Sequence, residues 1–219
     1  MPQSLGVLRS FPVDTEKKIP IFPLDVVLFP GAQLPLHIFE PRYRDMLRDC
    51  QAPGSDPVFA VVYARREGLA VTGCVARIVR TLKTYPDGRV DILTTGEQRC
   101  EILALDETRP YLQAQVRLLD DAAGPAPRAL REQAVAAHFE LLERAGETAS
   151  LPAIDLDHPV GFRLVPDLPL TLPVQQTFLS LATDHERTAM LLRIYDELLP
   201  PLRAQATTPS TNGSGPKVH

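Results

Sequence analysis

The chain has 219 residues, of which 44% are hydrophobic and 23% are charged, and its formal net charge is −4. This composition is typical of one or two globular domains and is too apolar for a disordered chain. The longest strongly apolar stretch, residues 58–64, is far shorter than the roughly 20 residues that span a bilayer. The net acidity excludes a general attraction to nucleic acid or to an anionic membrane.

The cysteines and the N-terminus indicate the compartment. Cys50, Cys74 and Cys100 are widely spaced and form no CxxC pair. An odd number of separated cysteines favours reduced thiols, which we expect to fill the core as small apolar residues. The chain does not open on a basic segment followed by an apolar run, so we expect no secretory signal and a cytoplasmic location.

The first half of the chain is predicted to be mostly β-structure. Residues 1–18 have no periodicity and are expected to form a loose arm. Short apolar runs then predict strands over residues 19–24, 33–39, 58–64, 71–85, 89–95, 98–105 and 111–119. Tyr85-Pro86-Asp87-Gly88 is a strong hairpin turn, and Gly96 indicates a bulge. Strands of this kind predict a closed or nearly closed antiparallel barrel over residues 19–121.

One helix interrupts this β-region. Pro41 suits the first position of a helix, and the spacing predicts a helix that runs to Cys50. Tyr43, Met46, Leu47 and Cys50 then share its apolar face.

The second half is predicted to be helical. Residues 122–127 are rich in Ala, Gly and Pro and indicate a domain boundary. We expect a helical bundle over residues 127–203, with helices over 128–145, near 160–165, over 173–182 and from a capping box at Thr183 and Glu186. Pro200-Pro201 is expected to stop the last helix, and residues 204–219 to be a disordered tail.

We found no catalytic or metal-binding motif. The only G-x-G, at residues 213–215, has no strand before it, and no Gly-Lys-Ser/Thr occurs. His185-Glu186 begins a zinc-protease motif, but Ala189 stands where the second histidine is needed. Asp155, Asp157 and His158 are better explained as helix-capping residues than as metal ligands. We therefore expect no catalytic residue, no metal and no cofactor.

Several segments resemble the N-terminal domain of the Lon proteases. They are IPIFPLDVVLFPG at residues 19–31, LPLHIFEPRY at 34–43, TGCVARI at 72–78, PDGR at 86–89, TGEQRC at 95–100 and DHER at 184–187. The resemblance covers about residues 17–204. It implies an α+β fold in which an N-terminal antiparallel PUA-like β pseudobarrel is followed by a small C-terminal α-helical bundle. It also implies a substrate-recognition module, here expected without the ATPase and protease domains of Lon and therefore not an enzyme.

The leading hypothesis is a module that binds unfolded or peptide segments of other proteins, with no membrane partner. Its expected anchors are Leu34, Leu36, Phe39 and Tyr43, which are apolar and close together in the sequence. Cooperation with a full-length Lon and formation of a homodimer are left open.

Two alternatives come from other classes of function. An RNA-binding barrel would use Arg77, Arg80 and Lys83 near the predicted hairpin, although the acidic residues of the same domain make nucleic acid a poor partner. A small hydrolase would need His37 or His138 beside a carboxylate in a polar pocket. Without such a pocket, both histidines are expected to be structural.

Overall fold

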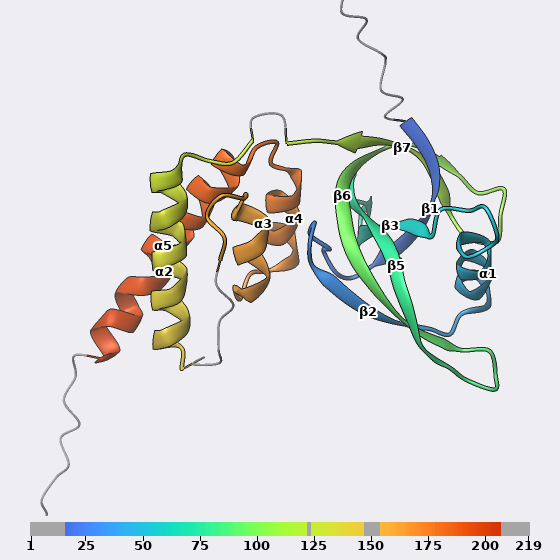
Figure 1. The fold of residues 1–219 in the computed structure, drawn as a ribbon, viewed down its shortest axis with the longest axis horizontal. Helices are drawn as coiled ribbons and strands as arrows, with labels where there is room; N and C mark the ends of the chain where they lie inside the picture. The colour runs from blue at the N-terminus through green and yellow to red at the C-terminus, as the bar shows by residue number, and fades with distance from the viewer. Residues whose placement is uncertain (1–15, 122–123, 147–153, 207–219) are drawn as a thin grey trace, which may run out of the picture. The chain divides into compact units, whose positions relative to one another are not determined.

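The computed structural model describes residues 16–121, 124–146 and 154–206. The chain divides into two compact units, Met1–Leu119 and Asp120–His219, each of which is described by itself (Figure 1). None of the helices in the described residues combines the length and the apolar character needed to cross a bilayer.

The first unit is a closed β-barrel. Its strands are β1 (Glu16–Leu24), β2 (Gln33–Ile38), β3 (Val58–Arg65), β4 (Gly68–Leu69), β5 (Thr72–Thr84), β6 (Val90–Asp106) and β7 (Gln113–Leu119). Hydrogen bonds connect β1, β7, β6, β5 and β3 in that order, and β1 also pairs with β3. The antiparallel barrel is confirmed, with one difference: the β1–β3 seam is parallel. The intervening residues 25–57 carry β2 and a helix, which gives the chain the length that a parallel crossover needs.

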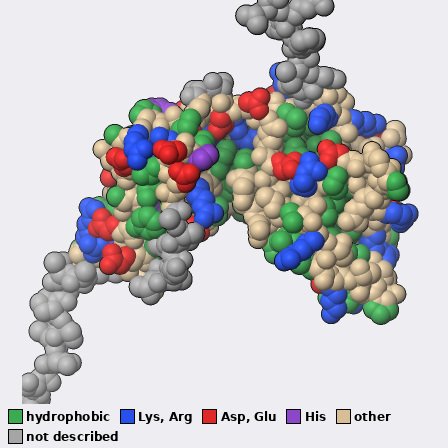
Figure 2. All heavy atoms as spheres, in the orientation of Figure 1, with side chains coloured by type: hydrophobic (Ala, Val, Ile, Leu, Met, Phe, Trp, Pro, Cys, Tyr) green, Lys and Arg blue, Asp and Glu red, His purple; other side chains and the backbone are tan. Residues whose placement is uncertain are grey.

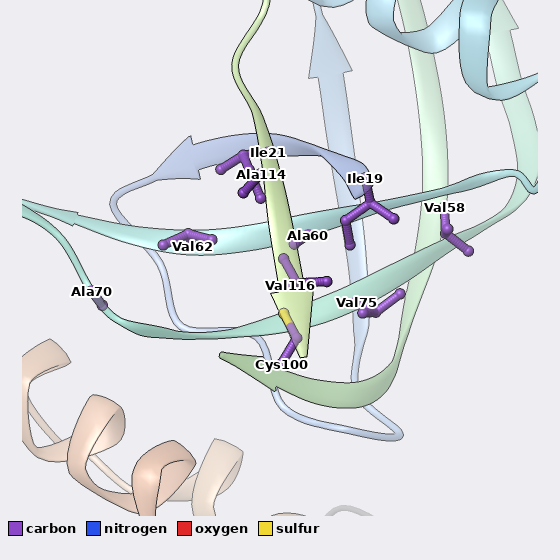
Figure 3. Packing of buried hydrophobic residues seen from close by; sticks show 10 residues of the cluster. All are labelled: Ile19, Ile21, Val58, Ala60, Val62, Ala70, Val75, Cys100, Ala114 and Val116. Atoms are coloured by element: carbon purple, nitrogen blue, oxygen red, sulfur yellow. The ribbon is translucent and has the colours of Figure 1, made fainter. Parts of the chain in front are cut away.

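Ten small and branched apolar residues fill the barrel. They come from β1, β3, β5, β6 and β7 and from the turn before β5, as Figure 3 shows: Ile19, Ile21, Val58, Ala60, Val62, Ala70, Val75, Cys100, Ala114 and Val116. On β7 the buried residues Ala114 and Val116 alternate with more exposed ones. This alternation is what allows one face of a strand to pack inside a barrel while the other meets water.

All three cysteines are buried and free, which confirms that they fill the core. Burial raises the pKa of Cys50 to about 11 and that of Cys100 to about 12, and it also raises the pKa of Cys74. These thiols therefore stay protonated near neutral pH, and protonated thiols are poor nucleophiles.

Strand β1 begins earlier than predicted. Glu16–Lys18, expected to belong to the loose arm, pair with residues 115–117 of β7. Because these three residues are polar, a prediction from hydrophobic periodicity could not include them in the strand. Backbone pairing with β7 and the Lys18–Asp106 ion pair hold them in place. The rest of the predicted arm, residues 1–15, lies outside the described residues.

Strand β6 is longer and less regular than predicted. It runs without interruption through the two predicted strands, and its register against β5 shifts between the Val75–Gln98 and Ala76–Gly96 pairs. The bulge expected at Gly96 is thereby confirmed. Beyond the barrel, β5 and β6 continue as a projecting hairpin (Figure 1).

The predicted helix of the first unit is confirmed as α1 (Pro41–Cys50). Tyr43, Met46, Leu47 and Cys50 are all buried, as the helical spacing indicates. Tyr43 packs against Phe22 of β1 with ring centroids 4.2 Å apart, so α1 is fixed to the barrel by an aromatic contact.

The second unit is helical. It contains α2 (Arg128–Arg144), α3 (Gly161–Leu164), the 3₁₀ turn η1 (Val165–Asp167), α4 (Leu172–Ser180) and α5 (Asp184–Ala206). Helices α2 and α5 pack along each other (Figure 1). The capping box is confirmed: the Thr183 N–H donates to Glu186 Oε2 at 2.9 Å, and the Glu186 N–H donates to Thr183 Oγ1 at 3.2 Å.

The predicted end of the last helix is wrong. Helix α5 continues through Pro200 and Pro201 to Ala206. Each proline removes a backbone donor, but the helix beyond them contacts α2, where Arg203 Nη2 donates to Glu140 Oε2 at 2.6 Å. Residues 207–219 of the predicted tail lie outside the described residues.

A buried polar cluster joins three segments of the second unit. The carboxylate of Asp184 accepts hydrogen bonds from the Ala126 and Gly161 N–H groups, both at 2.9 Å. Arg187, also fully buried, pairs with Asp121 and lies 3.9 Å from the centre of the Phe162 ring. Through these contacts the first turn of α5 fixes the start of α3 and the segment before α2.

His138 of α2 is buried at 1% exposure between two polar partners. Its Nδ1 lies 2.9 Å from the Tyr195 hydroxyl, and its Nε2 lies 3.3 Å from Asp167 Oδ2. Desolvation lowers the pKa of His138, and the opposing effect of Asp167 is smaller. The ring is therefore neutral in the folded protein near pH 7.

We expect this histidine to make stability depend on pH. Below about pH 6.5 the unfolded chain takes up a proton at His138 that the folded chain resists, so the free energy of unfolding falls as the pH falls. Urea unfolding at pH 7.5 and 5.5 should show a larger loss of stability in the wild type than in a His138→Gln variant. Equal losses in the two proteins would contradict the neutral, desolvated histidine.

Candidate functional site

The projecting hairpin and β2 form a three-stranded sheet with one open face. Strand β2 pairs with β6 in antiparallel register from Gln33 to Ile38, and the same part of β6 pairs with β5. Two rows of neighbours cross the sheet, Pro35–Leu93–Arg80 and His37–Asp91–Lys83. Every member of these rows is exposed or partly exposed. Phe39 and Tyr85 extend the same face because their rings contact the ring of His37.

We call this surface the open sheet face. It consists of Pro35, His37, Phe39, Arg80, Lys83, Tyr85, Arg89, Asp91 and Leu93.

The other side of the same sheet faces the core. Ile38, Ile78, Ile92 and Thr94 are buried there, and Thr94 Oγ1 donates to the Leu34 carbonyl at 2.8 Å. This arrangement holds β2 in register, because a slip of one residue would exchange the two faces.

The four predicted anchors are therefore not equivalent. Leu34 and Leu36 are half-buried on the core side of β2, and Tyr43 is buried against Phe22. Phe39, just beyond β2, is 59% exposed and belongs to the open sheet face. Only Phe39 among the four offers a large apolar surface to a partner.

An aromatic and carboxylate network gives the open sheet face its shape. The His37 ring stacks on Phe39 with centroids 6.0 Å apart and meets Tyr85 edge-on at 5.7 Å. Asp91 bonds both neighbours: its Oδ1 lies 2.5 Å from His37 Nδ1, and its Oδ2 accepts from the Tyr85 hydroxyl at 2.8 Å. The hydrogen bonds from His37 and Tyr85 lower the pKa of Asp91, which therefore remains a carboxylate.

Cations flank the aromatic rings. The Lys83 ammonium lies 4.4 Å from the centre of the Tyr85 ring, and the Arg89 guanidinium lies 5.0 Å from it. Arg89 also pairs with Asp87 at 2.7 Å. Arg80 is exposed, and its guanidinium has no carboxylate partner in the part of the chain that the structure describes. The face thus carries three cations, of which Arg89 is paired with Asp87, and the carboxylate of Asp91, in a protein whose net charge is −4. Figure 2 shows basic side chains at the lower right of the barrel, where the hairpin ends.

The basic residues proposed for RNA binding are not equally available. Arg77 is committed to two carboxylates: it bonds Asp56 at 2.8 Å and also pairs with Glu97. Arg80 and Lys83 remain on the open sheet face, beside the carboxylate of Asp91. Of the three basic residues, only Arg80 and Lys83 are therefore available to an RNA backbone, and acidic groups lie close by.

Neither histidine of the hydrolase alternative lies in a deep polar pocket. His37 has a carboxylate partner but stands on an open surface with its side chain 42% exposed. His138 is buried, and both of its ring nitrogens already face polar partners. A general base in a hydrolase must reach a proton of the substrate within an enclosed site. His37 is accessible but not enclosed, and His138 is enclosed but not accessible.

Residues 154–206 and the other described segments hold no group of three or more His, Cys, Asp or Glu side chains arranged around a metal. Asp155 instead serves local structure: its Oδ1 accepts from the Asp157 N–H at 2.8 Å, and its Oδ2 lies 2.8 Å from His158 Nδ1.

The second unit contains a different kind of hollow, with a volume of about 530 Å³. Its lining is apolar except for Asp167 and comes from α2, η1, α5 and the segment after η1. This hollow offers apolar contact without a cation, unlike the open sheet face.

Sequence reasoning missed Tyr85, Asp91 and Leu93 as site residues. The signal was present in the hairpin turn at residues 85–88, because a tight turn fixes which residues of β5 and β6 lie opposite each other. What the sequence could not supply was the pairing of β2 with β6, which brings residues 33–38 beside residues 90–95.

Comparison with known proteins identifies the family. Residues 18–193 match the family model of the ATP-dependent protease La (LON) substrate-binding domain. A Lon protease of Parabacteroides distasonis is 36% identical over 112 residues, which are 47% of this chain and 13% of that protein. A Lon protease of Haemophilus influenzae is 28% identical over 196 residues, which are 82% of this chain and 24% of that protein.

A solved structure agrees with these matches. The crystal structure of a Lon N-terminal domain protein from Xanthomonas campestris superposes with a TM-score of 0.65 at 27% identity, and the match covers 81% of this chain and 98% of that one. The chain thus spans a quarter or less of the two curated relatives but nearly all of the solved domain. The chain belongs to the family of the Lon substrate-binding domain.

Proposed function

We propose that this chain binds exposed segments of other polypeptides and does so without covalent chemistry. The open sheet face carries the proposal, because it presents an exposed aromatic side chain, Phe39, on a surface stiffened by strand pairing. The family description, a substrate-binding domain of a protease, supports a polypeptide as the ligand.

The physical basis of binding is contact between apolar groups on a preorganised surface. His37, whose ring is met edge-on by Tyr85, stacks on the Phe39 ring, which stays 59% exposed to water. Covering such a ring on binding stabilises a complex by about 2 kcal/mol, and a rigid sheet loses little conformational freedom in doing so. An unfolded segment supplies the apolar side chains that a folded protein keeps buried.

Fluorescence anisotropy with a panel of labelled, unstructured peptides tests this function on the full chain. We expect dissociation constants well below millimolar for part of the panel, and about tenfold weaker binding by Phe39→Ser. Val71→Ser is the matched control, because Val71 is 58% exposed but lies outside the open sheet face. Mass spectrometry should recover the peptides intact.

Two results would contradict the proposal. If no peptide of a broad panel binds more tightly than about 1 mM, the chain is not a polypeptide-binding module. If purified protein cleaves or modifies the peptides, its function includes chemistry.

A further inference from the structure

We infer that the preferred ligand of the open sheet face is an acidic polypeptide segment with aromatic or aliphatic side chains. This inference rests on the proposed function and adds the chemical class of the segment. It starts from the charge of the face, which is opposite in sign to that of the whole chain.

The cations of the face lie where a ligand would meet them. Arg80 and Lys83 occupy successive rows of the sheet, opposite Leu93 and Asp91 of β6. Two bulges interrupt the β5 side of the hairpin, between Ile78 and Arg80 and between Thr81 and Lys83, and these bulges keep both cations in rows of the same face. Each of the two rows therefore ends on a cation, Arg80 opposite Leu93 and Lys83 opposite Asp91.

The carboxylate of the face is already engaged by two neighbours. Asp91 accepts hydrogen bonds from His37 and Tyr85, whereas Arg80 has no carboxylate partner among the described residues. A basic ligand would have to compete with His37 and Tyr85 for Asp91. An acidic ligand would meet Arg80, which faces no carboxylate among the described residues, and Lys83, which lies opposite Asp91. This excess of positive charge is the charge complementarity that sets specificity in protein interfaces.

Apolar groups on the same face set the second requirement. Pro35 and Leu93 are direct neighbours in one row of the face, and Phe39 lies on the same face beyond the row of His37 and Asp91. A segment that combines Asp or Glu with Phe or Leu can contact these apolar groups and the cations together. The face favours a polypeptide over RNA because Phe39, Pro35 and Leu93 offer contacts to aliphatic and aromatic side chains, whereas only Arg80 and Lys83 are available to phosphates.

Charge reversal tests the inference in the full chain. The variant is Arg80→Glu combined with Lys83→Glu, and its control is Arg66→Glu with Lys17→Glu, which changes the charge equally at exposed positions elsewhere on the barrel. The probes are a labelled peptide rich in Asp, Glu, Phe and Leu, the same peptide with Lys at every acidic position, and a labelled structured RNA.

We expect the acidic peptide to bind best, to lose about tenfold in affinity in the Arg80/Lys83 variant, and to keep its affinity in the control. Its binding should also weaken between 50 and about 300 mM salt, because exposed charges are screened. The Lys-containing peptide should bind more weakly to the wild type and regain affinity in the Arg80/Lys83 variant.

The remaining outcomes overturn the inference in distinguishable ways. Equal binding of both peptides, with no effect of charge reversal, would refute the acidic preference and leave the proposed function intact. Binding of RNA alone, lost in the Arg80/Lys83 variant, would replace the polypeptide by nucleic acid. If none of the probes and none of the wider peptide panel binds, the proposed function itself fails.

Discussion

Asp184→Ala is expected to lower the free energy of unfolding of the helical unit by about 4 kcal/mol. Asp184 is fully buried and accepts hydrogen bonds from the Ala126 and Gly161 N–H groups. Alanine would leave both donors buried without an acceptor and would remove a carboxylate 3.9 Å from the buried guanidinium of Arg187. Unpaired buried donors and charges are among the costliest defects in a folded protein.

Hydrogen exchange measured by mass spectrometry on the full chain resolves this effect by segment. Peptides from α2 and α5 should lose protection in Asp184→Ala, while peptides from β5 and β6 keep theirs. Asp184→Asn is the control, because it has nearly the same shape and retains one oxygen acceptor, and it should cost about half as much. Unchanged protection of α2 and α5 in the alanine variant would show that the cluster does not hold the helical unit together.

Gly96→Ala is expected to have a comparable effect on the barrel, a loss of about 3 kcal/mol or more. A Cβ atom at this position would lie 2.2 Å from the Phe29 carbonyl oxygen and 3.1 Å from Cys74 Sγ. The backbone cannot move away freely, because the Gly96 N–H donates to Ala32 at 2.9 Å and its carbonyl accepts from Gly31 at 2.8 Å. Glycine is required here by a close backbone approach at a bulge.

The same hydrogen-exchange measurement checks this prediction with the pattern reversed. Protection should fall in β5 and β6 and persist in α2 and α5. Ala104→Ser, at an exposed position of the same strand, should change the stability by no more than about 0.5 kcal/mol. A Gly96→Ala protein as stable as this control would contradict the packing described around the bulge.

The features that sequence predicted well depend on short-range rules. Helix α1 has the predicted bounds because Pro41 starts it and its four core residues recur at helical spacing. The hairpin between β5 and β6, the bulge at Gly96 and the capping box at Thr183 and Glu186 each follow from a few adjacent residues. In each of these features, the interactions that decide the structure lie within one turn or one pair of strands.

The features that sequence missed depend on distant contacts. The parallel pairing of β1 with β3 joins segments that have no local signal for each other. Helix α5 passes through two prolines and contacts α2 beyond them, through the Arg203–Glu140 ion pair. In each case the structure depends on an interaction with a segment that is distant in the sequence, which a local sequence pattern does not include.

The candidate site shows the same difference between short-range features, which the sequence predicts, and distant contacts, which it does not. Apolar residues between positions 34 and 43 were recognised, but sequence could not tell which of them face the barrel. The pairing of β2 with β6 decides it: Leu34 and Leu36 turn toward the core side, and His37 turns toward the open sheet face. Phe39 lies beyond the last pair of the strand, where its ring stacks on His37 and remains exposed.

Placing the ligand on the protein tests the central claim most directly. NMR spectra of the isotope-labelled full chain, titrated with an unstructured acidic peptide that contains Phe and Leu, report which backbone amides sense the ligand. The account predicts shift changes concentrated at His37, Phe39, Lys83 and Leu93. Changes confined to the apolar hollow of the helical unit, or a spectrum unchanged at saturating peptide, would contradict it.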